Sequence, residues 1–138
     1  QYSDESVNDG GVGRAHLDAG EAWLTGYFDG SPTGDPKLDF SNLTRFQAEV
    51  SRTLIRGAGF GEVVSYGELA TAAGSPRASR AVGSAMADNP WTLLVPCHRV
   101  VRSDGVIGNY SALDGGATKR WLLSHEGQKF DSLSRLVR

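Results

Sequence analysis

Apolar residues recur at helical spacing in the central part of the chain. Phe46, Val50 and Leu54 follow one another at four-residue intervals, which places them on one face of a helix. Thr44 and Gln47 have the spacing of a capping box, with Thr44 as the N-cap and Gln47 as the third helical residue. The pattern therefore predicts a helix that begins after Thr44 and ends at one of the glycines that follow Leu54.

Two more helices are predicted in quick succession. Ser65 and Glu68 form a second capping box, and that helix ends at the glycine before Ser75. Ser75 would cap the next helix, with Pro76 at its first position. The second helix has a stripe of small apolar residues and one methionine, which we expect to be buried: Ala78, Ala81, Val82, Ala85 and Met86. Two short helices with almost no connection between them are typical of a helix-turn-helix.

A different face of the second helix carries Arg77, Arg80 and Ser84. Gly83 and Ser84 could let a nucleic-acid backbone come close, or could simply permit close packing of helices. Two-helix hairpins also occur in proteins that bind no DNA, so this pattern alone leaves both interpretations open.

The remaining elements are shorter. Turn and periodicity signals predict a short helix over 21–30, a strand over 91–95, a hairpin at Asp104-Gly105 and a last helix over 117–127. Behind a helix-turn-helix, the hairpin would be a wing. We expect residues 1–18 to be irregular and the polar tail over 128–138 to be frayed.

Composition narrows the class of protein. A chain of 138 residues suits one domain, or a domain with a small appendage. The single cysteine excludes an internal disulfide and a CxxC zinc site, and a free thiol suits a reducing, intracellular setting. The sequence has no run of about 18 apolar residues that would span a membrane, and its start lacks the pattern of a signal peptide.

The formal net charge of −2 hides an asymmetry. Residues 1–43 carry eight acidic and two basic side chains, whereas residues 44–138 carry eight acidic and twelve basic ones. The larger part is therefore net positive, which permits a polyanionic partner such as nucleic acid, although a solvated surface also explains the bias.

The only cysteine lies in the stretch LLVPCHRVV, residues 93–101. Pro96 favours the end of a strand, so Cys97 would sit on the turn beyond it. His98 could take the thiol proton through a bridging water, and Glu126 on the last helix could orient the imidazole. A lone cysteine is also often a small core residue, and both interpretations stay open on the dipeptide alone.

The sequence around Cys97 resembles that of the O6-alkylguanine-DNA alkyltransferase family. VPCHRVV, the preceding ASRAVGSAMADNP and the following GVIGNYS and KRWLLSHEG carry the resemblance, which covers the chain from about Phe46 to Gly127. It implies an α/β (α+β) fold in which a winged-helix-like helix-turn-helix domain over 44–127 holds both the DNA-binding surface and the active site. The shortened N-terminal segment over 1–43 and the tail over 128–138 flank it.

The resemblance implies DNA repair by an irreversible, single-turnover transfer of the alkyl group from O6-alkylguanine to the protein's own cysteine. The partner would be double-stranded DNA, bound in its minor groove by a monomer with the damaged base flipped out. No cofactor and no metal would be needed.

The resemblance also implies a role for individual residues. Cys97 would be the acceptor, His98 the base through a water, Glu126 the orienting carboxylate and Asn89 a brace for the active-site turn. The residues implied to bind the damaged base are Tyr66, Met86, Val100, Tyr110 and Ser111. The residues expected at the DNA are Arg80, whose side chain would enter the base stack, and Ala81, Gly83, Ser84, Arg77 and Arg99.

Two features depart from the family's usual pattern. The part before Phe46 is too short for the family's N-terminal domain, and the loop SALDGGAT that borders the pocket looks about two residues longer than usual, with Ala112 where glycine is common.

Two other classes compete with the transferase. Alkyltransferase-like proteins bind the lesion but lack the acceptor cysteine, which Cys97 argues against. A winged-helix regulator would prefer a DNA sequence rather than a lesion.

Overall fold

The computed structural model describes residues 21–30, 38–91, 93–107 and 116–138. The chain divides into two compact units, Gln1–Asp39 and Phe40–Arg138. In the first unit, residues 21–28 form the predicted helix, and Gly30 follows it with a φ of 89°. The expectation for residues 1–18 lies outside the described residues.

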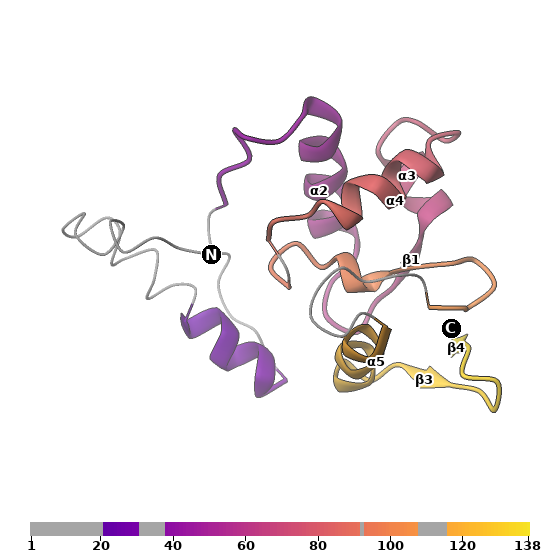
Figure 1. The fold of residues 1–138 in the computed structure, drawn as a ribbon. Coiled ribbons are helices and arrows are strands. Elements are labelled where there is room, and N and C mark those ends of the chain that lie inside the picture. The colour runs from indigo at the N-terminus through magenta and orange to yellow at the C-terminus, as the bar shows by residue number, and fades with distance from the viewer. Residues whose placement is uncertain (1–20, 31–37, 92, 108–115) are drawn as a thin grey trace. The chain divides into compact units, whose positions relative to one another are not determined.

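The second unit begins with helix α2, Arg45–Gly57 (Figure 1). The predicted capping box is confirmed, because the Thr44 hydroxyl accepts from the Gln47 N–H at 3.1 Å and the Gln47 side chain accepts from the Thr44 N–H at 2.9 Å. Val50 and Leu54 are fully buried, as their spacing predicts. The helix ends at Gly57, one of the glycines that follow Leu54, as predicted.

Helices α3, Tyr66–Ala72, and α4, Ser79–Ala87, pack against each other and form the predicted helix-turn-helix (Figure 1). The capping box of α3 is confirmed, with the Ser65 hydroxyl accepting from the Glu68 N–H at 3.0 Å. The predicted start of α4 is wrong. The Ser75 carbonyl accepts from the Ala78 N–H at 2.9 Å, so Ser75 and Pro76 form a turn and the helix begins only after it.

Helix α4 buries only part of its predicted stripe. Val82, Ala85 and Met86 are buried, whereas Ala78 is half-buried and Ala81 is exposed. The late start of the helix explains Ala78, which is its N-cap and lies at the edge of the packed face. Ala81, which the stripe had placed inside, therefore belongs to the exposed face of the helix.

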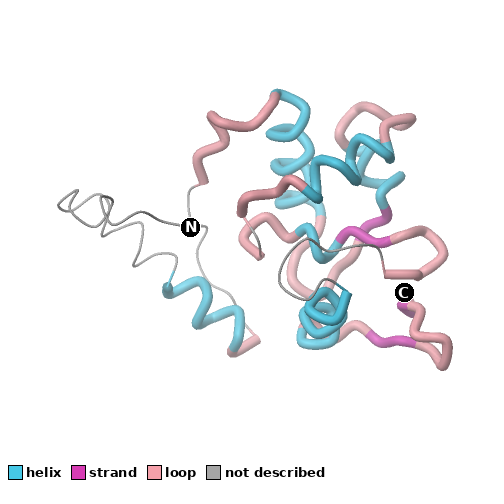
Figure 2. The backbone as a smooth tube through the Cα atoms, in the orientation of Figure 1, coloured by secondary structure: helices cyan, strands magenta, loops and turns pink. Residues whose placement is uncertain are grey.

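The strands are short, and helices dominate the described part of the chain (Figure 2). Strand β1, Val64–Ser65, pairs in parallel with β2, Val100–Val101. A 3₁₀ turn, η2, Cys97–Arg99, leads directly into β2. Because β1 also leads directly into α3, this pairing brings the start of the helix-turn-helix and the cysteine stretch to neighbouring positions in the fold.

The predicted strand over 91–95 is wrong. The Val95 N–H donates to the Trp91 carbonyl at 2.8 Å, and Leu93 has a φ of 76°, so this segment folds into turns. The turn at the expected hairpin does form. The Gly105 N–H donates to the Arg102 carbonyl at 3.0 Å, and Gly105 has a φ of 85°. The second arm of the wing lies largely outside the described residues.

Helix α5, Gly116–His125, is the predicted last helix, and Gly127 follows it with a φ of 94°. The expectation of a frayed tail is wrong. Strands β3, Lys129–Phe130, and β4, Leu136–Val137, pair antiparallel, and the Leu136 N–H donates to the Gly105 carbonyl at 2.7 Å.

The tail is ordered by a small apolar cluster that its polar composition concealed. Leu136 packs with the buried Val101 and Leu123, and Phe130 lies against the same cluster. The tail therefore joins the wing turn to α5. No helix in the described residues is long and apolar enough to span a membrane.

Candidate active site

Cys97 sits on a sharp elbow. Pro96, with a φ of −79° and a ψ of 63°, is the centre of an inverse γ-turn in which the Cys97 N–H donates to the Val95 carbonyl at 2.7 Å. The chain then turns into η2, where the Arg99 N–H donates to the Pro96 carbonyl at 2.9 Å. Cys97 is 5% exposed. Its thiol is thus held on a rigid turn just below the surface.

Asn89 braces this elbow from the end of α4, where the resemblance places it. Its Nδ2 donates to the Val95 carbonyl at 3.0 Å and to the Cys97 Sγ at 3.2 Å, and its Oδ1 accepts from the Trp91 N–H at 2.9 Å. One amide therefore ties three segments together. A donor aimed at the sulfur also stabilises a thiolate more than a thiol.

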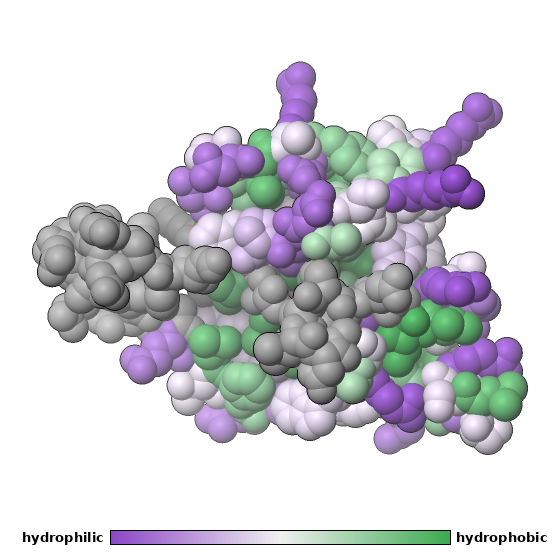
Figure 3. Space-filling model, in the orientation of Figure 1, coloured by the Kyte–Doolittle hydropathy of each residue, from purple (hydrophilic) through white to green (hydrophobic). Residues whose placement is uncertain are grey.

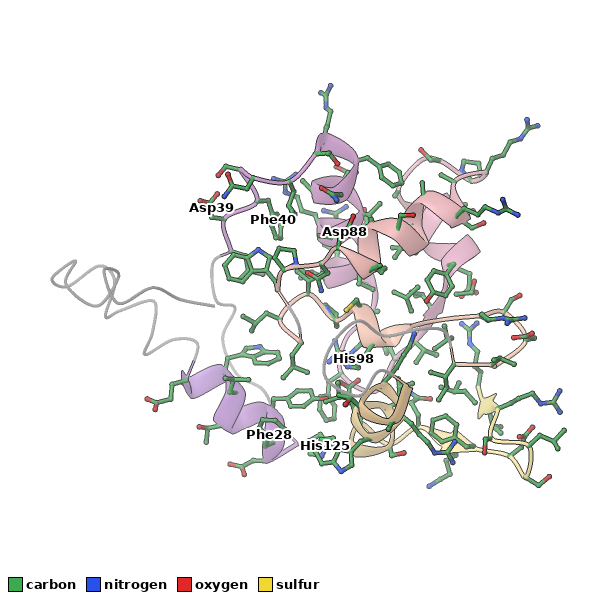
Figure 4. The ribbon with its side chains drawn as sticks, viewed as in Figure 1. Phe28, Asp39, Phe40, Asp88, His98 and His125 are labelled. Carbon is green, nitrogen blue, oxygen red and sulfur yellow. The ribbon has the colours of Figure 1, made fainter. Side chains whose placement is uncertain are left out.

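His98 is the middle residue of η2 and is fully buried, and Figure 4 shows it close to α5. Its Nε2 lies 2.6 Å from Glu126 Oε2. Burial raises the pKa of Glu126, but hydrogen bonds from His98 and Arg99 outweigh burial and lower the pKa to about 2. Glu126 is therefore an anion that only accepts, so the proton of a neutral His98 resides on Nε2.

The other ring nitrogen, Nδ1 of His98, is buried and has no hydrogen-bond partner among the described residues. With Nε2 protonated, Nδ1 carries the basic lone pair. Burial lowers the pKa of His98 more than Glu126 raises it. The histidine therefore rests neutral near pH 7, with its free lone pair available for a proton.

Arg99 corrects one of our expectations. We expected it at the DNA, but its side chain is only 7% exposed and faces inward. Its Nε and Nη2 donate to the two oxygens of Glu126 at 2.8 and 3.0 Å, and its Nη1 donates to the Ala58 carbonyl at 2.9 Å. A guanidinium held in this way is not available to phosphates.

Lys119 is a feature of the site that sequence reasoning missed. It is fully buried on α5, and its Nζ donates to the Val100 carbonyl at 2.6 Å. Burial lowers the pKa of Lys119 to about 8, and the negative charge of a Cys97 thiolate opposes that shift. A buried cation therefore acts on the thiolate and holds the first residue of β2.

Both buried cations, the misplaced Arg99 and the missed Lys119, carried a signal in the sequence. Arg99 stands directly between His98 and two valines, in a stretch that is buried throughout, and arginine is rarely buried unless it is paired. Lys119 likewise lies one helical turn before the buried Leu122 and Leu123. The sequence alone does not name the partner in either case.

The implied base-binding residues are only partly described. Tyr66 begins α3 half-buried, and burial, with a smaller contribution from the charge of Cys97, raises the pKa of its hydroxyl. Its ring lies 5.8 Å from Lys119 Nζ. Met86 is 5% exposed, the same fraction as Cys97. Tyr110 and Ser111 lie outside the described residues.

The backbone carbonyls of Cys97 and Val100, two of the residues implied for the site, already accept hydrogen bonds from the protein. That of Cys97 accepts from the Val100 N–H, and that of Val100 accepts from Lys119. A carbonyl oxygen has two lone pairs, so each retains the capacity for one more donor.

The residues expected at DNA, apart from Arg99, lie on or near one helix. Arg77, Arg80, Ala81 and Ser84 are exposed, and Gly83 is half-buried. A Cβ built on Gly83 would lie 4.0 Å from the Tyr66 ring, an ordinary contact distance. Figure 3 shows hydrophilic side chains projecting from the upper part of the molecule, where Figure 1 places α2, α3 and α4.

Comparisons with known proteins identify relatives of this chain. The family model for the DNA-binding domain of 6-O-methylguanine DNA methyltransferase matches residues 45–128. The methylated-DNA–protein-cysteine methyltransferase of Rattus norvegicus is 49% identical over 113 residues, which cover 77% of this chain and 53% of the rat protein.

Two solved structures are informative. Mycobacterium tuberculosis OGT in complex with DNA superposes with a TM-score of 0.72 at 40% identity, covering 80% of this chain and 65% of that one. Schizosaccharomyces pombe Atl1, in complex with damaged DNA containing O6-carboxymethylguanine, has a TM-score of 0.54 at 33% identity, covering 66% and 85%. The chain spans about half the length of the curated relatives it matches.

Proposed function

The chain belongs to the 6-O-methylguanine DNA methyltransferase family, and from that premise we propose that it repairs DNA by moving the alkyl group of O6-alkylguanine onto Cys97. The observation that carries the proposal is the buried series Cys97, His98 and Glu126, with a donor from Asn89 on the sulfur. We also propose that it acts inside the cell, as a monomer, on double-stranded DNA.

His98 prepares the nucleophile. Its Nδ1 takes the thiol proton through a bridging water, and the resulting imidazolium is stabilised by the Glu126 carboxylate 2.6 Å from Nε2. Glu126 itself stays ionised, because its pKa lies at about 2. The Asn89 Nδ2 and the buried Lys119 ammonium stabilise the thiolate that remains.

The sulfur then attacks the alkyl carbon. A lone pair of the Cys97 thiolate forms the S–C bond while the C–O6 bond breaks, and guanine leaves as an anion that takes one proton. Over the whole reaction, a thiol and O6-methylguanine become a thioether and guanine, and no other reactant is consumed. The Tyr66 hydroxyl, which burial keeps protonated, is the donor that would stabilise the departing base.

The base must leave the duplex to reach the thiol of Cys97, a residue that is only 5% exposed. Helix α4 supports docking to DNA, because its exposed face combines the small Ala81 and Ser84 with Arg80. An inserted side chain offsets part of the unstacking cost of a few kcal/mol, and we propose Arg80 for that place.

The test is a direct assay of transfer. The protein is incubated with a duplex that contains one O6-methylguanine, its intact mass is measured, and the modified peptide is mapped. We expect a gain of one methylene on the peptide with Cys97, and no gain in Cys97→Ser.

Two other outcomes would reject the transferase. No mass gain with tight, lesion-selective binding would assign the chain to the lesion-binding class. No mass gain and a preference for a DNA sequence would assign it to the winged-helix regulators.

A further inference from the structure

The Glu126 carboxylate is held from several sides. It accepts from His98 through Oε2, from Arg99 through both oxygens and, at a longer 3.4 Å, from the Gly61 N–H through Oε1. Its side chain is fully buried. It also follows the last residue of α5, where the helix dipole disfavours a negative charge.

A buried anion at the C-terminal end of a helix needs a compensating cation. His98 is neutral at rest, so it cannot supply the charge. Arg99 is the cation that lies in direct contact with both oxygens, at 2.8 and 3.0 Å. The planar guanidinium forms two parallel hydrogen bonds and fixes the plane of the carboxylate as well as its charge.

Arg99 is itself fixed from the opposite side. Its Nη1 donates to the carbonyl of Ala58, in the loop between α2 and β1, and the same loop supplies the Gly61 N–H and accepts from Gln128 Nε2 at 2.6 Å through the Gly61 carbonyl. The guanidinium therefore lies between a buried carbonyl and a buried carboxylate, with its donors directed at both.

Resting on the proposed function, we propose that Arg99 is a positioning residue for the transfer reaction. It orients Glu126 toward His98 and offsets the charge of that carboxylate, so that His98 rests neutral and accepts the Cys97 proton only as the reaction begins. Arg99 touches neither the thiol nor the substrate in this role and acts through Glu126.

The charged and polar groups around His98 determine the direction in which the pKa of His98 changes when Arg99 is replaced. Burial lowers the pKa of His98, Glu126 raises it, and the positive charges of Arg99 and Lys119 lower it. Cys97 lies next to His98 on η2, and Tyr66 on α3 responds to the charge of Cys97. Removing the guanidinium leaves Glu126 uncompensated, so His98 should bind its proton more tightly.

The first experiment follows the His98 imidazole by NMR titration, with His98→Gln used for assignment, in wild type and Arg99→Gln. We expect the pKa of His98 to rise by about one unit in Arg99→Gln. The rising limb of the pH–rate profile of transfer should move to higher pH by the same amount. This titration does not depend on transfer, so a failure of the proposed function would be seen separately.

Arg99→Lys keeps the charge but loses the paired hydrogen bonds. We expect His98 to titrate near its wild-type pH in this variant while transfer slows by about tenfold, because orientation alone is impaired. In a Glu126→Gln background, Arg99→Gln should raise the pKa of His98 by less than it does in the wild-type background, because only the direct repulsion between the two cations is then lost. Arg135→Gln, which removes an exposed arginine paired with Asp131, is the matched control.

Two results would overturn the proposal. One is an unchanged His98 titration in Arg99→Gln with transfer reduced equally at every pH, which would make Arg99 a purely structural residue. The other is full wild-type transfer in Arg99→Lys, which would remove the orienting role. If Arg99→Gln fails to fold, the Arg99→Lys comparison still decides the second point. A pH–rate midpoint in Arg99→Lys that moves away from the wild-type value, although the charge is kept, would contradict the charge role.

Discussion

At the scale of single residues, the chemistry depends on which charges are buried beside the thiol. The sequence predicted Cys97, His98 and Glu126, because a thiol, an imidazole and a carboxylate together suggest a known kind of chemistry. It placed Arg99 on the surface and ignored Lys119, because a one-dimensional pattern does not show which cations face inward. Only the fold shows that Arg99 meets Glu126 across 27 positions of sequence.

Lys119 provides a prediction at this scale. Its pKa in the folded protein is about 8, below the usual 10.5. Between these values the unfolded chain holds a proton that the folded protein has released, so stability rises with pH from 8 to 10.5. The full change is worth about 3 kcal/mol. Urea unfolding across this range should show the rise in wild type.

Lys119→Met is the comparison that isolates this effect. The variant lacks the titrating group, so its stability should change less over the same range, and subtracting the two curves removes the contribution of every other group. Parallel curves for the two proteins would show that Lys119 titrates normally in the folded state. The prediction would then be wrong, whatever the effect on transfer.

At the scale of elements, signals confined to a few neighbouring residues predicted the structure well. Both capping boxes form, and α2, α3 and α5 end near the expected glycines. The errors arose where contacts between residues far apart in the sequence determine the local structure. The segment at Leu93 is held in turns by the Asn89 amide rather than extended, and the tail is ordered because Leu136 reaches the core.

The two capping boxes provide a matched pair of variants. Thr44→Ala and Ser65→Ala remove the same kind of hydrogen bond, so each should reduce the free energy of unfolding by about 1 kcal/mol. Only Ser65 precedes Tyr66, which begins α3 beside the thiol. We therefore expect Ser65→Ala to slow transfer several-fold and Thr44→Ala to leave it nearly unchanged.

Chemical denaturation and single-turnover assays on the same preparations check this pair. Because the stability losses are similar, a difference in transfer reports on the position of Tyr66 rather than on the amount of folded protein. Equal transfer rates in the two variants would mean that the start of α3 does not set the reactive geometry. A larger effect in Thr44→Ala would also contradict the prediction.

At the scale of the whole molecule, a single helix and the two residues after it connect the exposed basic face to the thiol. Helix α4 presents Arg80 outward, and Asn89, two residues beyond its end, holds the sulfur. Docking of α4 to DNA would thus be connected to the active-site turn through a few rigid residues. Net positive charge over 44–138 favours the approach of a polyanion.

The exposed arginines Arg77 and Arg80 have two different expected roles, a phosphate contact and insertion into the base stack. Assays with duplex DNA and with the free O6-methylguanine base distinguish these roles. Arg77→Ala should weaken binding to all duplexes alike and reduce the salt dependence of log K by about 0.9, as expected for one lost phosphate contact. Arg80→Ala should slow repair of the lesion in duplex DNA by about tenfold or more, because the flipped state loses the inserted side chain. Both variants should react with the free base at the wild-type rate, since neither arginine touches the thiol.

Arg135→Ala, in the C-terminal hairpin, should change none of these quantities. A loss of free-base reactivity in Arg80→Ala would mean that α4 shapes the active site itself, and an unchanged duplex rate would remove Arg80 from base flipping.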